Sequence, residues 1–174
     1  MRIAMAGPRP TIRAATSEDL KAVAEINAHY VTNSVATFDE TPRALDGWRR
    51  WLEELTERGL PFLVADLSGE VAGYAYAGPW RPKPAYRHTV EDTIYVAPGH
   101  LGRGLGKALL GLLVAESTQA GMHRMIAVIA DTGDGASAAL HHRFGFTEAG
   151  RLTDVGYKHG RWIDTLLMQR PLTG

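Results

Sequence analysis

The segment Tyr95–Leu110, "YVAPGHLGRGLGKALL", constrains the fold more than any other part of the chain. It joins an apolar run typical of a β-strand to a leucine-rich run typical of an α-helix, with Gly102, Gly104 and Gly106 between them. A helix N-terminus carries unpaired N–H groups and the positive end of the helix dipole, so it binds phosphate where glycines let the backbone come close. The segment therefore predicts a phosphate-binding turn; a glycine-rich connection without a ligand is the alternative.

The glycine spacing excludes two common nucleotide-binding motifs. The dinucleotide fingerprint needs a further gap before its third glycine and an acidic residue after the second strand of a βαβ unit. A P-loop needs Gly-Lys-Ser/Thr at its end, and Gly106-Lys107 is followed here by alanine. Any phosphate bound at this turn therefore belongs to a different class of ligand.

Length and periodicity predict the fold class. The 174 residues suit one compact domain, so we expect a single domain over residues 1–174, with residues 1–10 as a loose N-terminal segment. Alternating and helical patterns follow the order βααβββαβαβ, with a further strand near "FTEAGRLTDV". These patterns predict an α/β fold with a mixed central sheet flanked by about four helices.

Local signals place three elements of this order. Thr16 and Asp19 form a capping-box pattern at the start of the first helix. The pair Thr41–Pro42 predicts the N-cap and first residue of the second helix. The Ser68–Gly69 turn lies between two alternating apolar runs, which predicts an antiparallel hairpin.

Composition excludes several classes of function. Lys plus Arg equals Asp plus Glu at 19 each, without long runs of one charge, which disfavours nucleic-acid and membrane-surface binding. The chain has no cysteine, which excludes disulfides, Cys-ligated zinc, Fe–S clusters and thiolate catalysis. The N-terminus has no apolar signal region, and the apolar runs are too short to cross a bilayer. We expect a cytoplasmic protein without nucleic-acid or membrane partners.

The glycine segment resembles the pyrophosphate loop of the GNAT (GCN5-related N-acetyltransferase) superfamily, Gln/Arg-x-x-Gly-x-Gly/Ala. Gly104 and Gly106 fall on its two small positions. The strings "ATFDETP", "AYAGPW", "AYRHTVEDTIYV", "LHHRFGF" and "GYKHGRWID", spread from about Ile12 to Arg170, are similar to the phosphinothricin and methionine-sulfoximine acetyltransferases. The resemblance implies transfer of an acetyl group from acetyl-CoA to the α-amine of phosphinothricin, methionine sulfoximine or its sulfone. It also implies a homodimer.

By this resemblance, the backbone of the glycine loop binds the pyrophosphate of acetyl-CoA through Gly102, Arg103, Gly104, Leu105, Gly106 and Lys107. At two positions that concern acetyl-CoA binding, the sequence departs from the family pattern. Leu101 stands where the family usually has Gln or Arg, and Asp134 stands where the family has an Asn three residues before Ser137. An acid close to the phosphates or the pantetheine arm either weakens binding or turns to solvent.

The strand "TVEDTIYVA" supplies the candidate general base. A free α-amino group is largely protonated near neutral pH, so acetylation requires a proton acceptor. Alternation places Glu91, Thr93 and Tyr95 on one face of the strand and Asp92 on the other. The resemblance makes Glu91 the base, acting directly or through a water, with a pKa that burial raises. A solvated strand acid is the alternative for Glu91, and Asp92 is its rival if the strand contains a bulge.

Two further catalytic groups are implied by the resemblance. The backbone N–H of Val96 becomes the oxyanion donor if the strand parts from its neighbour just before the glycine loop. His141, in "LHHRFGF", occupies the position from which many family members protonate the CoA thiolate with a tyrosine. The alternative for His141 is a buried, hydrogen-bonded histidine, and for His142 an exposed one. Adjacent histidines lack the i, i+4 spacing of a helical metal site, so we expect no metal.

Substrate contacts are predicted around the base. The resemblance implies Arg81, Lys83 and Tyr86 as contacts to an anionic substrate and Phe38 as an apolar lid. Strand alternation adds Thr93 and Tyr95, on the same face as Glu91, as substrate-binding residues. A solvated basic loop is the alternative for Lys83 and Arg87. "GYKHGRWID" predicts no catalytic role; a turn at the rim of the site and a dimer contact both fit Tyr157–His159.

Two other functions remain open. One is acetylation of a different amine, such as a polyamine, an aminoglycoside or a protein N-terminus, although a basic loop before Glu91 repels cationic substrates. The other is a non-catalytic acyl-CoA sensor, for which Leu101 and Asp134 are the observations.

Overall fold

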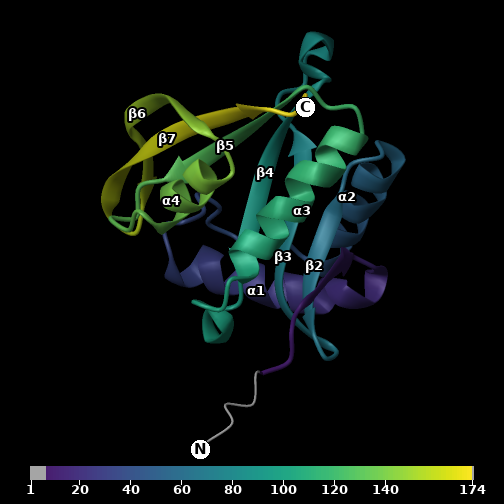
Figure 1. The fold of residues 1–174 in the computed structure, drawn as a ribbon. Helices are drawn as coiled ribbons and strands as arrows, with labels where there is room; N and C mark the ends of the chain where they lie inside the picture. The colour runs from purple at the N-terminus through teal and green to yellow at the C-terminus, as the bar shows by residue number, and fades with distance from the viewer. Residues whose placement is uncertain (1–6, 174) are drawn as a thin grey trace, which may run out of the picture.

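A computed structural model describes residues 7–173, in which a mixed sheet has α-helices on both faces (Figure 1). The strands are β1 (Thr11–Ala14), β2 (Phe62–Leu67), β3 (Glu70–Pro79), β4 (Thr89–Val96), β5 (Arg124–Ala130), β6 (Thr147–Lys158) and β7 (Arg161–Pro171). The α-helices are α1 (Leu20–Asn33), α2 (Leu45–Glu57), α3 (Leu105–Gln119) and α4 (Ala136–Arg143). The predicted order of elements and the fold class are confirmed, and the strand near "FTEAGRLTDV" is β6. Residues 1–6 of the predicted loose segment lie outside the described residues.

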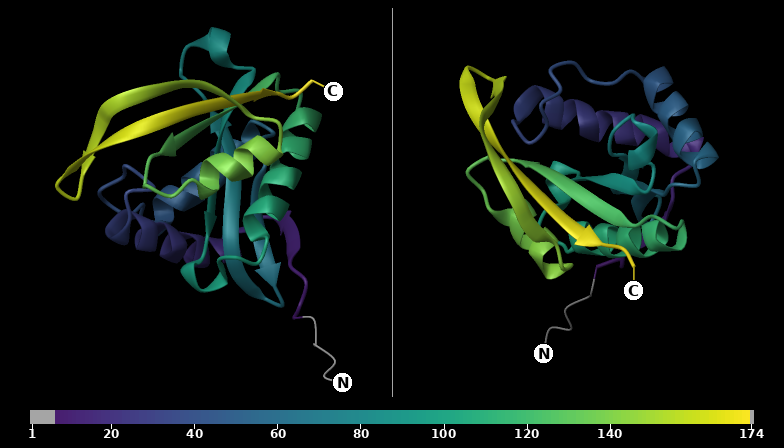
Figure 2. Two further views of the ribbon diagram at one scale, coloured as in Figure 1. Left: turned by 60° about the vertical axis from the view of Figure 1, so that its left-hand side comes forward. Right: turned by 90° about the horizontal axis from the view of Figure 1, so that it is seen from above.

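The sheet is open between its two central strands. Its order is β1-β2-β3-β4-β5-β7-β6, and β4 and β5 are parallel while the other neighbours are antiparallel. Pairing of β4 with β5 extends only over Thr89–Glu91 and Arg124–Ile126, after which the strands part. Helices α1 and α2 cover one face, and α3 and α4 the other (Figure 2). The predicted parting of the strand before the glycine loop is confirmed.

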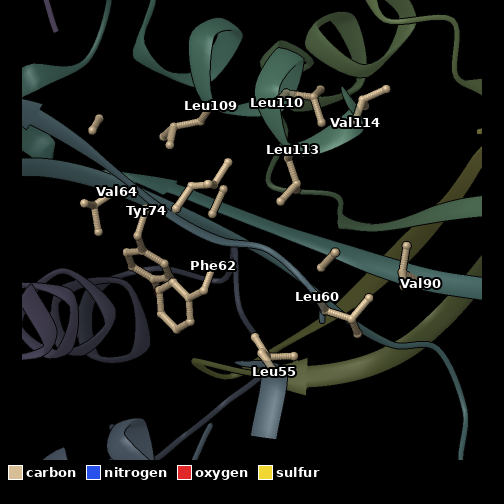
Figure 3. Packing of buried hydrophobic residues seen from close by; sticks show 14 of the residues in the cluster. Leu55, Leu60, Phe62, Val64, Tyr74, Val90, Leu109, Leu110, Leu113 and Val114 are labelled. Atoms are coloured by element: carbon tan, nitrogen blue, oxygen red, sulfur yellow. The ribbon is translucent and has the colours of Figure 1, made fainter. Parts of the chain in front are cut away.

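Apolar side chains pack on both faces of the sheet, on the side of the opening that contains β2 and β3. Leu109 and Leu113 of α3 pack on one face, whereas the rings of Phe62 and Tyr74 lie on the other (Figure 3). Burying one such side chain contributes roughly 1.5–3 kcal/mol relative to exposure. Trp48 of α2 contacts the rings of Phe62 and Tyr74 edge-on. Strands β2 and β3, which lie next to β4 in the sheet, are therefore packed on both faces.

Two of the three local predictions are confirmed, and one is wrong. The Thr16/Asp19 capping box is present, and the Ser68–Gly69 turn has φ angles of 53° and 93°. The second helix does not begin at Thr41–Pro42; α2 begins at Leu45, after an extended Ala44. The reason is a tertiary contact, because Asn27 Oδ1 of α1 accepts the N–H of Arg43 at 3.2 Å and holds this stretch outside the helix.

The β6–β7 hairpin is long and extends beyond the neighbouring strands (Figure 1). It closes at His159 and Gly160, whose φ angles of 50° and 72° are those of a type I′ turn. The register shifts between Leu152 and Gly156, so β6 is bulged there. The tip lies beside the loop that follows α1 (Figure 2). Across residues 7–173, every helix is too short or too polar to cross a membrane.

Candidate active site

A cleft of about 540 Å³ lies where β4 and β5 part. Its walls come from the loop after α1, from β3, β4 and β5, and from the first turns of α3 and α4. The predicted residues among its lining are Phe38, Glu91, Thr93, Tyr95, Val96, Leu101, Gly106, Asp134, Ser137 and His141. Segments far apart in the sequence therefore meet at the opening of the sheet.

The glycine loop is built as an anion site. Gly102 and Gly104 both have φ near 77°, a conformation that other residues adopt with strain, and an added Cβ at either would meet open space. Gly104 is the N-cap of α3 and has no side chain to cap it. The first helical hydrogen bond runs from Ala108 N–H to Gly104, so the N–H groups of Leu105, Gly106 and Lys107 have no partner within the helix. The arrangement fits a phosphate group.

Among the remaining residues of the glycine loop, one side chain is buried in the core and the others are exposed. Leu105 is buried in the core, so only its backbone faces the loop. Arg103 and Lys107 are exposed, and Arg103 lies beside His100, which also pairs with Glu70 at 3.1 Å. Leu101 is 61% exposed and carries no polar group to the cleft. This side of the site therefore relies on backbone donors and on the two surface cations.

Val96 presents its backbone to the gap. The N–H of Ala97 donates to Ala72 of β3, and alternation in an antiparallel pair directs the Val96 N–H and C=O the opposite way. The Val96 carbonyl already accepts the hydroxyl of Tyr30 from α1. The Val96 N–H is thus a donor at the mouth of the opened sheet, as the parting of the strands predicted.

Glu91 is the last residue of β4 that pairs with β5, and it lines the cleft. Burial raises the pKa of its carboxyl to about 7; the charge of Asp92 adds to the rise, and the charge of Arg81 opposes it. A carboxylate with a pKa close to neutrality exchanges protons readily under working conditions. The geometry and the pKa suit a general base.

Asp92 lies on the opposite face of β4 and is bound to His141. Asp92 Oδ2 and His141 Nε2 are 2.7 Å apart, both side chains are buried, and the β3–β4 register is regular. No bulge brings Asp92 to the side of Glu91, so the predicted alternation is confirmed. His142 is exposed.

His141 has hydrogen-bond acceptors at both ring nitrogens. Nδ1 lies 2.7 Å from the carbonyl of Ser137 and Nε2 faces the Asp92 carboxyl. Burial alone lowers the pKa of His141, but the hydrogen bond and charge of Asp92, with the Ser137 carbonyl, raise it overall. Both ring nitrogens of His141 therefore face oxygen acceptors on the wall of the cleft, an arrangement that favours the charged imidazolium.

The side of β4 that carries Glu91 also carries polar and aromatic groups, and these line the end of the cleft away from the glycine loop. Thr93 and Tyr95 line it, and burial raises the pKa of Tyr95 to about 12, so its hydroxyl stays protonated. That hydroxyl points at the Ala36 carbonyl at 3.4 Å. Phe38 is 39% exposed and lies on the cleft wall in the loop after α1.

The predicted basic contacts lie outside the lining of the cleft. Arg81, Lys83 and Tyr86 are exposed on the loop between β3 and β4, and Arg81 stacks on the ring of Trp80 at 4.8 Å. Of these three, Arg81 is close enough to Glu91 to influence its pKa. Their contact with substrate stays a prediction.

Asp134 has a local role at the start of α4. Its Oδ1 accepts the N–H of Ala136 at 2.9 Å, and its own N–H donates to Thr132 Oγ1 at 3.3 Å. The carboxylate thus binds the first N–H of α4 from the residue before the N-cap Gly135, and it remains on the wall of the cleft beside Ser137.

Sequence reasoning missed several residues of the site. Arg43 stacks over Trp48 at 4.5 Å, lines the cleft, and has a buried Nη1 without a hydrogen-bond partner among residues 7–173. Tyr30 and Asn27 of α1 also line the cleft. No local motif marks these residues, since their roles arise only when α1 and α2 pack on the sheet. Within the same residues, no three His, Asp or Glu side chains cluster as metal ligands.

Comparison with known proteins gives consistent matches over most of the chain. The family described as "Acetyltransferase (GNAT) domain" matches residues 12–167. A phosphinothricin N-acetyltransferase of Alcaligenes faecalis is 44% identical over 162 residues, which are 93% of this chain and 82% of that protein. An L-methionine sulfoximine/L-methionine sulfone acetyltransferase of Salmonella typhimurium is 40% identical, covering 93% of this chain and 94% of that protein. The solved structure of a phosphinothricin acetyltransferase from Sinorhizobium meliloti with acetyl-CoA has a TM-score of 0.89 and 45% identity, covering 93% of this chain and 88% of that one.

Proposed function

The chain belongs to the GNAT acetyltransferase family, and we propose that it transfers an acetyl group from acetyl-CoA to the α-amine of a small amino-acid-like compound. Phosphinothricin and methionine sulfoximine or its sulfone are the first candidates, supported by the names of relatives that are 44% and 40% identical. The observation that carries the proposal is the opening between β4 and β5, with Glu91 at its start and the Val96 amide further along. The predicted family and acetyltransferase activity are confirmed.

The residues around the glycine loop fit acetyl-CoA. The uncapped N-terminus of α3 and the left-handed Gly102 and Gly104 provide backbone donors for its pyrophosphate. The gap beyond Glu91 leaves room and a free Val96 N–H for its extended arm. When bound, acetyl-CoA supplies the acetyl group as an activated thioester. Arg103 and Lys107 are placed to add positive charge at the surface end.

Glu91 removes the proton from the substrate ammonium. With a pKa of about 7, its carboxyl is substantially ionised at neutral pH and can accept that proton directly or through a water. The neutral amine then forms the N–C bond to the acetyl carbon. Val96 N–H donates to the carbonyl oxygen on which negative charge develops, and the C–S bond breaks.

His141 is the candidate group that stabilises the departing sulfur of CoA. As the C–S bond breaks, the thiolate needs a proton or a hydrogen bond. The hydrogen-bonded pair of His141 and Asp92 lies on the cleft wall, and the imidazolium charge stabilises a nearby anion. We assign to this pair the stabilisation of the departing thiolate, with Asp92 holding the imidazole ring, and the thiolate takes up the second proton that the substrate nitrogen loses as the amide forms.

The charged groups at the amine end of the cleft, where Glu91 and Phe38 lie, favour a substrate that carries both an ammonium and an anionic group. Arg43 places a guanidinium on the cleft wall, and Arg81 lies close to Glu91. These cations complement a carboxylate, phosphinate or sulfoximine oxygen, while Glu91 and Asp39, which also line the cleft, complement the ammonium of the same substrate. Thr93 and Tyr95 supply hydroxyl groups, and Phe38 covers the apolar part of the substrate.

Thiol release from acetyl-CoA tests the function. Purified protein is assayed with phosphinothricin, methionine sulfoximine, methionine sulfone, spermidine and an aminoglycoside, and acetyl-CoA binding is measured by calorimetry. We expect release with the first three amines. Release with only the last two contradicts the substrate class. Binding of acetyl-CoA without release from any amine instead supports the acyl-CoA sensor.

We propose the β6–β7 hairpin as the contact surface of the predicted homodimer. Tyr157 and Trp162 are paired across the hairpin with rings 4.9 Å apart, and they are 58% and 63% exposed. Exposed aromatic pairs of this kind are typical of protein contacts. Sedimentation velocity of the full chain distinguishes monomer from dimer.

A further inference from the structure

The loop between α1 and α2, residues 34–44, forms part of the cleft wall at the amine end. Ala36, Thr37, Phe38 and Asp39 all line the cleft. The segment has no helix or strand, so side-chain contacts must determine where it lies. The Tyr95 hydroxyl points at the Ala36 carbonyl at a long 3.4 Å and also interacts with the Thr37 side chain, and neither contact involves the Phe38 ring.

Lys158 supplies the strongest of these contacts. It is the last residue of β6, it is only 3% exposed, and its Nζ donates to the Thr37 carbonyl at 2.8 Å. Burial lowers the pKa of its ammonium, while the charges of Asp39 and Glu40 oppose this. Burying a charged group is costly unless it is paired and hydrogen-bonded. The bond to Thr37 and the nearby charges of Asp39 and Glu40 reduce this cost, and all three of these residues belong to the loop.

Gly156 makes a second contact, two residues earlier on the same face of β6. A Cβ built at Gly156 would lie 2.4 Å from Cε2 and 2.5 Å from Cζ of Phe38. The phenyl ring therefore packs directly on the glycine backbone. Gly156 is buried and does not have a positive φ, so close packing, not backbone conformation, requires glycine here.

We propose that Lys158 and Gly156 form a latch that holds Thr37 and Phe38 over the amine end of the cleft. Lys158 is then a positioning residue: it fixes the loop, and the loop fixes the amine. The inference rests on the proposed function, because that function places the amine substrate beside Glu91 under Phe38. Since acetyl-CoA occupies the other end of the cleft, loss of the latch weakens binding of the amine and spares acetyl-CoA.

Steady-state kinetics of Lys158→Met tests the latch. Methionine is close to lysine in shape but lacks the ammonium. We expect KM for the amine to rise about tenfold, the loss of one hydrogen bond to a charged group, and KM for acetyl-CoA to stay within about twofold. Lys21→Met, the same change at an exposed site on α1, is the matched control and should change neither constant. An unchanged amine KM, or equal rises in both constants, overturns the proposal.

Gly156→Ala disrupts the contact with Phe38 independently and leaves Lys158 unchanged. Its Cβ pushes the exposed Phe38 ring aside, so the amine KM should rise several-fold, about threefold to tenfold. In a Phe38→Ala background the added Cβ meets no ring, and Gly156→Ala should have no further effect. Additive effects of the two changes contradict the contact as the source of the loss.

Hydrogen exchange separates failure of the latch from failure of the proposed function. It is measured on ligand-free protein, with peptides covering residues 34–44. We expect faster amide exchange of this segment in Lys158→Met and unchanged exchange in α3. If the wild-type protein acetylates no amine of the panel, the proposed function fails while this result still supports the latch. Unchanged exchange in residues 34–44 overturns the latch whatever the activity.

Discussion

The two ends of the cleft are made of different parts of the chain. The end proposed to bind acetyl-CoA is mainly backbone: left-handed Gly102 and Gly104, the uncapped start of α3, and the N–H of Val96. The amine end is mainly side chains from separate elements, such as Glu91 on β4 and Phe38 in the loop after α1. The glycine-loop end is made mainly of one continuous segment, so the local sequence specifies it. The amine end instead depends on long-range packing between separate elements. Changes at one end should therefore leave the ligand of the other end bound.

The largest effect is expected for Glu91→Gln. The amide cannot accept the amine proton, so kcat should fall on the order of a hundredfold or more. Affinity for acetyl-CoA should stay unchanged, because its end of the cleft does not use this carboxylate. Rapid-mixing kinetics and calorimetry on the same preparation measure both quantities. Retention of normal kcat would exclude Glu91 as the base.

Asp92→Asn should have the next largest effect, on stability. The change removes the charge paired with the His141 imidazolium and should cost about 2 kcal/mol, or roughly 4–8 °C in Tm. Because the folded pKa of His141 is raised, this stabilisation is full below its unfolded pKa near 6.5 and is lost as pH rises through the folded pKa. The Tm difference from wild type should therefore shrink between pH 6 and pH 9. A difference that grows over this range contradicts the ion pair.

Gly104→Val tests the backbone end. A branched residue is strained at φ 77° and its side chain enters the space before the helix N-terminus, so acetyl-CoA should bind about tenfold or more weakly. Gly99→Ala, in the same connection but with open space and no positive φ, is the control. Normal acetyl-CoA affinity in Gly104→Val would show that the phosphates bind elsewhere.

The smallest effect is expected for Leu101→Gln. Leu101 is largely exposed, so the change should not disturb the fold, and the amide adds one donor near the glycine loop. Acetyl-CoA should bind about threefold more tightly, the gain of a solvent-exposed hydrogen bond. Calorimetry measures the change. Weaker binding would indicate that the leucine itself contacts the ligand.

The backbone end and the sheet could be predicted from the sequence because their signals are local. Glycine spacing predicted the turn, and strict alternation in "TVEDTIYVA" predicted that Glu91 and Asp92 lie on opposite faces of β4. The Ser68–Gly69 turn was predicted for the same reason. Each of these features is determined by residues within a few positions of one another.

The features that sequence reasoning missed or misplaced are tertiary. The start of α2 was predicted at Thr41–Pro42, but a hydrogen bond from Arg43 to Asn27 displaces it. The contact between Lys158 and Thr37 spans 121 positions of the chain and has no sequence signature. The bond between His141 and Asp92 spans 49 positions. Pairings of this length depend on how the helices and the hairpin pack on the sheet.

The pH dependence of kcat, at saturating acetyl-CoA and methionine sulfoximine, tests the central claim most directly. In the wild-type protein, kcat should fall about tenfold per pH unit below an inflection near pH 7, as the Glu91 carboxyl takes up a proton and loses its function as base. In Glu91→Gln this inflection should be absent. An identical inflection in the variant would assign the proton transfer to another group and contradict the account.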